Sequence, residues 1–243
     1  MEEVNELFED LRPQYPTTTT SIKIGGNDYH IELSEIPYLA AFANFERTKA
    51  QNQQKELVHG PIAHFDTALE GMEFGFRQCF RSIPPDLAQH HALCETYEFL
   101  CIDVLGGKSL NEIIGGLKTG RRVHKGASKS SNSIKRDRSK ARDSAFQLLY
   151  FILRGEFEDE MKDSTDVYNA VMFIVSHADT FQWRTRKVVR AAYEDRFVVS
   201  VKQIAGLNKW EEDEDEDDED DVMSEEEESI SSGYYSDYDP FYN

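Results

Sequence analysis

The sequence predicts an α+β protein that is mostly helical and carries a small β-sheet of two or three strands. Three observations lead to this prediction: a β-hairpin pattern near the N-terminus, long stretches with apolar residues at helical spacing, and two charged segments with few apolar residues. An apolar content of 39% in 243 residues is enough for a hydrophobic core. We predict five parts: an N-terminal segment (1–17), an α+β domain (18–107), a basic disordered linker (108–142), a helical C-terminal subdomain (143–207) and an acidic disordered tail (208–243).

The β-hairpin is predicted in residues 21–33. Apolar and polar residues alternate on both sides of a Gly-Gly-Asn-Asp turn at 25–28, which is the pattern of two antiparallel strands. Leu57-Val58 can add a short third strand. The Gly-Gly pair lacks the Lys-Ser/Thr of a phosphate-binding loop, so we do not predict one. Residues 35–47 predict a short helix that exposes Tyr38, Leu39, Phe42 and Phe45 on one face.

Residues 63–105 predict a helical hairpin. Apolar residues at helical spacing over 65–80 indicate one helix of about four turns, which Pro84-Pro85 end. Asp86 is the predicted N-cap of a second helix, with Gln89 completing a capping box. We expect this helix to end at Gly106-Gly107 and to bury Leu87, His91, Cys94, Tyr97, Cys101 and Val104.

Helical patterns return after residue 143. Residues 146–153 are apolar on nearly all sides, which predicts a centrally buried helix. Two more helices carry apolar stripes within 168–175 and 188–197, and Trp183 lies at the predicted turn between them, beside Arg184 and Arg186.

Several of these motifs together resemble a BTB/POZ domain, and most closely the divergent members of that family found in fungi. Tyr38-Leu39 stand where the family has Tyr-Phe, and Phe65, Leu69 and Gly75 match its Phe-x-x-Leu-Leu helix that ends near glycine. The run 146–157 resembles the same helix, so the domain closes either with residues 65–105 or with residues 146–197. The resemblance implies a non-enzymatic interaction adaptor that self-associates or serves a cullin-type ubiquitin ligase.

Charge is distributed very unevenly along the chain. Residues 118–142 contain ten Lys/Arg and one Asp, and they have almost no apolar residues, so we expect them to be disordered. The clusters Arg121-Arg122 and Lys135-Arg136 are typical of a bipartite nuclear import signal. The alternatives are a plain linker and an electrostatic contact with a nucleic acid or an acidic peptide. Without interleaved aromatic residues, sequence-specific RNA binding is not expected.

The C-terminal segment has the opposite charge. Residues 211–243 contain 17 acidic and no basic residues, which predicts an extended, disordered tail. Near its end, Tyr234, Tyr235 and Tyr238 lie among acidic residues. Such a tail maintains solubility or binds basic chains, including the protein's own basic segment. The alternative function is therefore a nuclear protein that binds histones or other basic proteins through its acidic tail.

The residues do not predict a catalytic, metal or cofactor site. His90 and Cys94 are spaced to place two metal ligands on one helix face, but zinc needs four ligands and no CxxC or HxxxH motif occurs. Cys79, Cys94 and Cys101 all fall on predicted helix faces, which suits a reducing compartment. The acidic N-terminus lacks a secretory or mitochondrial signal and no apolar run is long enough for a membrane helix. We expect nuclear or cytoplasmic localisation and protein partners, rather than a membrane or a nucleic acid.

Overall fold

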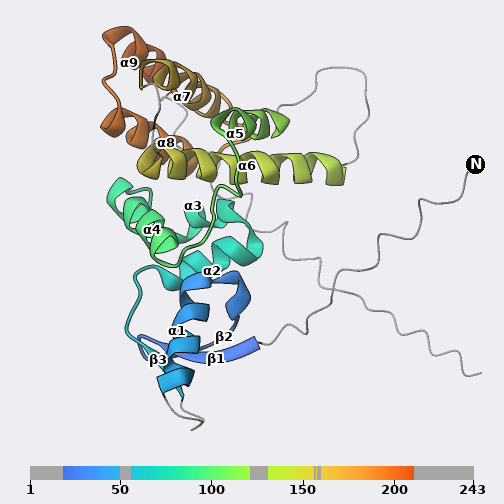
Figure 1. Cartoon of the computed structure of the whole chain (residues 1–243). Helices are drawn as coiled ribbons and strands as arrows, with labels where there is room; N and C mark the ends of the chain where they lie inside the picture. Colours follow the sequence, from blue (N-terminus) through green and yellow to red (C-terminus); the bar gives the residue numbers. More distant parts are fainter. Residues whose placement is uncertain (1–18, 50–55, 121–130, 156, 158–159, 211–243) are drawn as a thin grey trace, which may run out of the picture.

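The computed structural model describes residues 19–49, 56–120, 131–155, 157 and 160–210, and for 160–163 the backbone only. Three strands, β1 (Thr19–Ile24), β2 (Asn27–Glu32) and β3 (Leu57–His59), form one sheet. The helices are α1 (Pro37–Lys49), α2 (Phe65–Phe74), α3 (Cys79–Ser82), α4 (Leu87–Phe99), α5 (Leu110–Leu117), α6 (Ser131–Arg154), α7 (Glu160–Val175), α8 (Trp183–Arg196) and α9 (Val201–Asn208), with 3-10 turns η1 (Leu33–Glu35), η2 (Phe76–Gln78) and η3 (Lys118–Gly120). These elements confirm the prediction of a mostly helical α+β protein with a small sheet. Figure 1 shows the sheet at one end, α7, α8 and α9 at the other, and α6 between them.

The sheet has the order β2-β1-β3, in which β1 is antiparallel to β2 and parallel to β3. The predicted hairpin and third strand are therefore confirmed. The turn is shorter than predicted, because Gly25 and Gly26 have φ angles of 59° and 101° and close it in two residues. Asn27 consequently starts β2. Ile22 and Ile24 are buried, which places the helices on that face of the sheet.

The predicted single helix over 65–80 is wrong, because the chain forms α2, η2 and α3 in its place. The break lies at Gly75, whose φ of 95° is in the left-handed region. A Cβ atom there would lie 2.8 Å from Asp143 Oδ1, so glycine suits the position on both counts. The break directs Phe76 onto α6, where its ring stacks on the Phe146 ring at a centroid distance of 5.7 Å.

Helix α4 begins as predicted but ends early. The Asp86 side chain accepts a hydrogen bond from the Gln89 amide at 2.9 Å, which caps the helix. The helix ends at Phe99 rather than at Gly106-Gly107, and Cys101 has a φ of 58°, which a helix does not allow. Of the residues predicted to be buried, Cys94, Tyr97 and Val104 are buried, Leu87 and His91 are half-buried, and Cys101 is exposed.

Helix α6 is the central element and contacts η2, α4, α5 and α8. The predicted buried helix at 146–153 forms its second half and is confirmed. Gln147 is buried there, and its side chain donates to the Val104 carbonyl and accepts from Lys108 Nζ, each at 3.0 Å. These two hydrogen bonds fasten the loop between α4 and α5 to α6, so the buried amide has its polar atoms satisfied.

The expectation of disorder is wrong for residues 131–142, because they form the first half of α6. Lys, Arg and Ala favour helices, and extending a helix that is already packed costs far less than starting a new one. α6 also continues without a break through the predicted boundary after residue 142, and α5 lies within the predicted linker. The rest of the expected disorder, at 121–130 and 211–243, lies outside the described residues, as does the predicted N-terminal segment.

Buried apolar side chains from β1 to α9 form one continuous core. The sheet, α2 and α4 contribute to the same core as α5, α6, α7 and α8, so residues from both predicted domains are packed together. Within the part of the chain that the structure describes, no helix combines the length and apolar character needed to cross a membrane.

Candidate functional site

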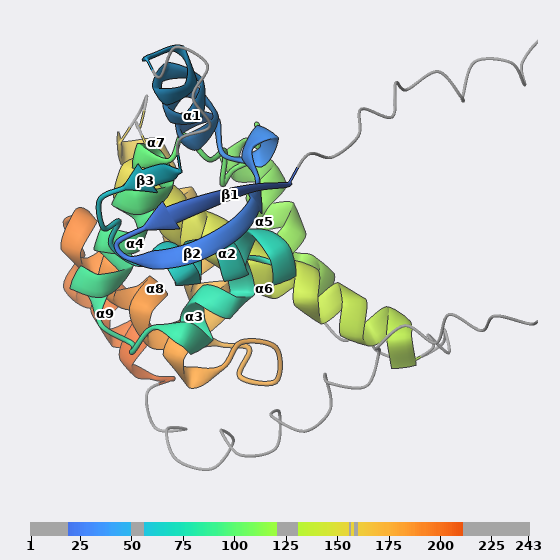
Figure 2. The same cartoon turned by 90° about the horizontal axis from the view of Figure 1, so that it is seen from below.

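Two of the predicted partner-binding residues are described by the structure. Lys135 and Arg136 lie near the start of α6 and are both exposed. This end of α6 projects beyond the neighbouring helices in both views (Figures 1 and 2). The other predicted residues, Arg121, Arg122, Tyr234, Tyr235 and Tyr238, lie outside the described residues.

The first half of α6, residues 131–142, is a basic helical arm. It is joined to the body near its C-terminal end, where Ala141 is fully buried. In addition, Arg142 Nε donates to the Thr180 carbonyl at 2.8 Å, and Thr119 Oγ1 donates to the Asp137 carbonyl at 3.3 Å. Lys135 and Arg136 therefore project from an ordered helix, not from the coil that the composition predicted. The exposed cations of the arm can attract an acidic chain. Residues 131–142 contain no aromatic side chain.

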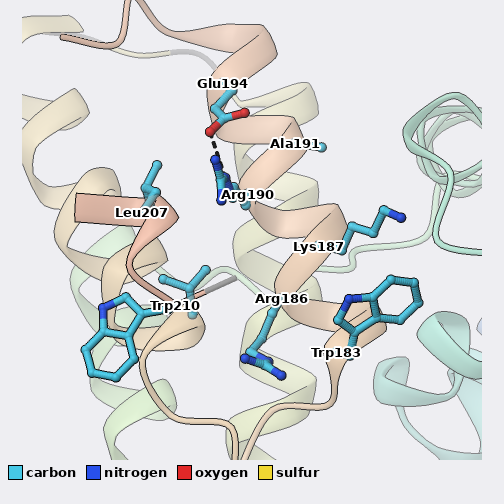
Figure 3. Close-up of a pocket in the computed structure, with 9 residues that line it drawn as sticks. Trp183, Arg186, Lys187, Arg190, Ala191, Glu194, Leu207 and Trp210 are labelled. Atoms are coloured by element: carbon cyan, nitrogen blue, oxygen red, sulfur yellow. Dashed lines mark hydrogen bonds and ion pairs between the residues drawn. The ribbon is translucent and has the colours of Figure 1, made fainter. Parts of the chain in front are cut away.

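A pocket of about 200 Å³ between α7, α8 and the end of α9 is a second cationic site, and the sequence did not predict it. Helix α8 supplies most of its lining. The lining residues are Val175, Trp183, Arg186, Lys187, Arg190, Ala191, Glu194, Leu207 and Trp210. Figure 3 shows Trp183 and Trp210 on opposite sides of the pocket with Arg186 between them.

The charges in this pocket are mostly positive. Its lining has three cationic side chains and one carboxylate, that of Glu194. The carboxylate accepts a hydrogen bond from Arg190 Nε at 2.7 Å, drawn in Figure 3, and Arg190 Nη2 donates to Asn208 Oδ1 at 2.6 Å. Arg190 thereby joins α8 to α9.

Both indoles of the pocket lie beside lysine side chains. Lys187 Nζ lies 4.5 Å from the centroid of the Trp183 ring, and Lys209 Nζ lies 5.5 Å from that of Trp210. Indole faces and guanidinium groups bind flat aromatic groups, whereas the cations bind carboxylates or phosphates. The pocket therefore suits a ligand that combines negative charge with an aromatic ring.

A sequence signal for this pocket exists but is weak. Trp183, Arg186, Lys187 and Arg190 follow one another at i, i+3, i+4 and i+7, which places them on one side of a helix. The same helix also carries apolar residues at helical spacing, and this stronger pattern was the one used to predict the helix. Trp210 adjoins the acidic run and was assigned to the tail, whereas its ring packs against the core.

A third feature is an exposed cluster of rings on α1, β3 and the end of α4, which we call the aromatic surface: Tyr38, Phe42, Phe45, His59 and Phe99. The Tyr38 ring lies 4.3 Å from the Phe99 ring, and the Phe42 ring lies 5.0 Å from the His59 ring, between centroids. Phe45 continues the same side of α1 and is 64% exposed, and Phe99 is 46% exposed. Exposed apolar clusters of this kind mark interaction sites.

Hydrogen bonds fix the ring positions in the aromatic surface. Tyr38 Oη lies 2.9 Å from His59 Nε2, and His59 Nδ1 donates to the Gly60 carbonyl at 2.8 Å. The prediction that Leu39 is exposed beside these rings is wrong: it is fully buried, because it lies with Ala43, four residues further on, on the side of α1 that packs against the core. The surface is thus a preorganised set of rings above a packed helix.

The side chains of Cys79, Cys94 and His90, on α3 and α4, are part of the core. Burial raises the pKa of the Cys79 thiol to about 12 and also raises the pKa of Cys94, so both stay protonated at neutral pH. His90 Nδ1 donates to the Asp86 carbonyl at 2.9 Å. Among the residues that the structure describes, no three His, Cys, Asp or Glu side chains lie close enough together to hold a metal ion.

The chain was compared with protein-family models, with curated proteins and with solved structures, and none of them matches it. The aromatic surface, the basic arm and the pocket are therefore the observations on which a function rests.

Proposed function

We propose that this protein is a non-enzymatic protein–protein interaction adaptor that self-associates through its aromatic surface. The observation that carries the proposal is the exposure of Phe45 and Phe99, at 64% and 46%, in a cluster whose other rings are held in place by packing and hydrogen bonds. Aromatic residues are enriched in the centres of interfaces, and charged residues are depleted there.

A second copy of the chain is the occupant that we propose for this surface. A two-fold interface brings the same patch of each subunit together, so it must be self-complementary. Rings satisfy this condition, because offset and edge-to-face packing need no opposite charge on the partner. The resemblance to BTB/POZ domains supports the same choice, because it implies self-association.

The test is the mass of the whole chain in solution, measured by light scattering during size-exclusion chromatography over a range of concentrations. We expect twice the monomer mass at micromolar concentrations, and a shift towards the monomer only on strong dilution. A monomer mass at every concentration would contradict self-association and leave the aromatic surface to a different partner.

The same resemblance supports a role in recruiting a cullin-type ubiquitin ligase in the nucleus or cytoplasm. The corresponding experiment is co-precipitation of a cullin with the tagged chain from cells, compared with a variant in which Phe99 is replaced by alanine. Recovery of a cullin only with an intact aromatic surface would connect this role to that surface. The absence of any cullin in both samples would remove this role and leave self-association standing.

A function of another class is favoured by the composition of the acidic tail, with 17 acidic and no basic residues over 211–243. In this alternative the protein binds histones or other basic chains in the nucleus through electrostatic contacts that weaken as salt increases. Binding of purified histones at low salt, retained when Phe45 is replaced but lost when the tail acids are neutralised, would favour this function over the adaptor.

A further inference from the structure

Strand β2 is an edge strand with one open hydrogen-bonding side. The sheet order is β2-β1-β3, so β1 pairs with one side of β2, and among the described residues no strand pairs with the other side. In Figure 2 the sheet lies in front of the helices and β2 forms its lower border. We propose that this edge binds an extended, basic segment of a partner protein, which adds an antiparallel strand to the sheet.

The register of the hairpin determines which backbone groups of β2 are available. Ile24 and Asn27 flank the two-residue turn and lie opposite each other, which is the position of a hydrogen-bonded pair in such a hairpin. These pairs recur at every second residue. The intervening residues of β2, Asp28, His30 and Glu32, therefore direct their amide and carbonyl groups to the open edge. Within the described part of the chain, no other element forms a backbone hydrogen bond with these three residues.

The edge lacks several features that block strand addition in natural proteins. β2 pairs with β1 through six consecutive residues without a bulge, and it contains no proline and no lysine. Its two carboxylates argue against a second copy of β2 as the occupant. Antiparallel overlap centred on His30 would pair Asp28 of each copy with Glu32 of the other, and like charges at such positions are destabilising. The occupant is therefore a strand of opposite charge.

The surroundings of the edge also favour a basic partner. β2, the following turn η1 and helix α2 carry two, one and three acidic residues, respectively, and no Lys or Arg. Tyr29 connects β2 to α2, because its ring lies 5.0 Å from that of Phe65 between centroids and its hydroxyl donates to Asp66 Oδ1 at 2.7 Å. A lysine or arginine of an added strand would gain favourable interactions with these carboxylates.

The pleat of the sheet determines the sequence pattern of the partner segment. The side chains of Asp28 and Glu32 lie on the face of the sheet opposite to that of Ile31, which is buried. Residues of an added antiparallel strand that lie opposite Asp28 and Glu32 are therefore basic. The residues between them are apolar, because they share the face of Tyr29 and Ile31. Basic and apolar residues alternate in such a segment.

This inference does not depend on self-association through the aromatic surface. Strand β3, which carries His59 of that surface, is the opposite edge of the sheet. The two sites are therefore separate, and an adaptor could use both at once. Failure of strand addition would leave self-association standing, because the mass of the chain measures it independently.

The experiment measures the fluorescence anisotropy of a labelled peptide of alternating lysine and valine, titrated with the whole chain. In the proposed antiparallel pairing the lysine amides face β2 and the valine amides face away, because residues directly opposite each other exchange both hydrogen bonds. We expect N-methylation of the lysine amides to weaken binding about tenfold, through the loss of these hydrogen bonds. The matched control is N-methylation of the valine amides, which should change binding by less than about twofold.

Two pairs of variants locate the site on the protein. His30→Pro removes an amide hydrogen that faces the open edge and should weaken binding about tenfold, whereas His30→Ala keeps this amide and should bind normally. Proline is tolerated at edge positions whose N–H faces solvent, so thermal melting should show that both variants fold. Glu32→Lys should weaken binding, whereas Asp195→Lys on α8 makes the same change in charge and should not.

The proposal is overturned if the unmethylated peptide does not bind, or if the two methylated peptides bind equally, because the contact would then involve charge without strand pairing. Equal binding by His30→Pro and His30→Ala would exclude the edge of β2 as the site. Equal losses in Glu32→Lys and Asp195→Lys would mean that the peptide responds to net charge alone. If His30→Pro does not fold, the two methylated peptides still decide the question.

Discussion

Arg77 and Asp143 connect the break after α2 to the middle of α6. The Arg77 amide donates to Asp143 Oδ1 at 2.9 Å, and Arg77 Nη1 lies 3.3 Å from Asp143 Oδ2. Both side chains are about three-quarters buried, at 22% and 28% exposed. Burial raises the pKa of the Asp143 carboxyl group, and the contacts with Arg77 lower it by less. The pair is thus partly desolvated, and its main effect is to fix the position of η2 against α6.

Removing this carboxylate should destabilise the fold. We expect Asp143→Ala to lower the free energy of unfolding by about 1–3 kcal/mol, because it leaves the buried Arg77 groups without their acceptor. Urea denaturation measures the change. The matched control is Asp28→Ala, which breaks the exposed Lys23–Asp28 ion pair of 3.9 Å and should cost only about 0–1 kcal/mol. Equal losses in both variants would show that Asp143 has no special structural role.

The buried half of α6 should tolerate no charge. Leu149 is fully buried, and Leu149→Asp places an unpaired carboxylate in the core at a cost of several kcal/mol, against roughly 5–15 kcal/mol of total stability. We expect loss of soluble, folded protein, measured by circular dichroism and thermal melting. Ile134→Asp is the control on the same helix, where the side chain is 41% exposed, and it should leave the melting temperature nearly unchanged. Unfolding by both variants would mean that the basic arm is also essential for folding.

Local signals were sufficient to predict much of this fold. The hairpin, the third strand, the Asp86 cap and the buried helix at 146–153 each depend on a few neighbouring residues, whose turn, cap or apolar pattern determines the local structure. The apolar spacing over 65–80 missed the break at Gly75, although the BTB/POZ-like motif has a helix end near this glycine. The close approach of Asp143 to Gly75 is distant in sequence and has no local signal.

The local structure of the basic segment was mispredicted for a related reason. Composition predicted disorder for 131–142, but this segment extends a helix whose stability comes from the packing of Phe146 and Leu149. The pocket depends on bringing Trp210 next to α8, which no local pattern contains. Part of the aromatic surface was predicted from the sequence, because Tyr38, Phe42 and Phe45 lie at helical spacing on α1. The contacts of these rings with His59 and Phe99 join residues distant in sequence and were not predicted.

His90 should make the protein less stable in mild acid. Burial lowers the pKa of His90 below its ordinary value of 6.5, and the nearby Asp86 offsets this only in part. Its Nε2 atom is buried without a hydrogen-bond partner in the structure, so a proton there has no acceptor. The unfolded chain therefore binds this proton first, and stability is complete above pH 6.5 and falls as the pH drops below that value towards the lower folded pKa.

The measurement is the urea midpoint at about pH 7.5 and about pH 5.5, on either side of the ordinary histidine pKa. His90→Phe should reduce the loss of stability between the two conditions, by at most about 1.4 kcal/mol per pH unit. His30→Gln is the control, because His30 is exposed on β2. The interpretation is wrong if His90→Phe leaves the difference between the two conditions unchanged.

The basic clusters Arg121-Arg122 and Lys135-Arg136 are expected to direct the protein to the nucleus. We expect replacement of Arg121, Arg122, Lys135 and Arg136 by alanine in the fluorescently tagged chain to lower its nuclear fraction. The control replaces four lysines elsewhere with alanine: Lys23, Lys49, Lys202 and Lys209. An unchanged nuclear fraction in the first variant would assign these residues to a linker or to an electrostatic contact instead.

Self-association through the aromatic surface is tested most directly by sedimentation of two variants with the same chemical change. Phe45→Asp introduces a charge into the aromatic surface, and Phe74→Asp does the same on α2, outside it, where the side chain is 54% exposed. We expect Phe45→Asp to sediment as a monomer, because a buried, unpaired carboxylate opposes association, while Phe74→Asp and the unmodified chain remain dimeric. A dimer that persists in Phe45→Asp, or a monomer in the unmodified chain, would contradict the proposed interface.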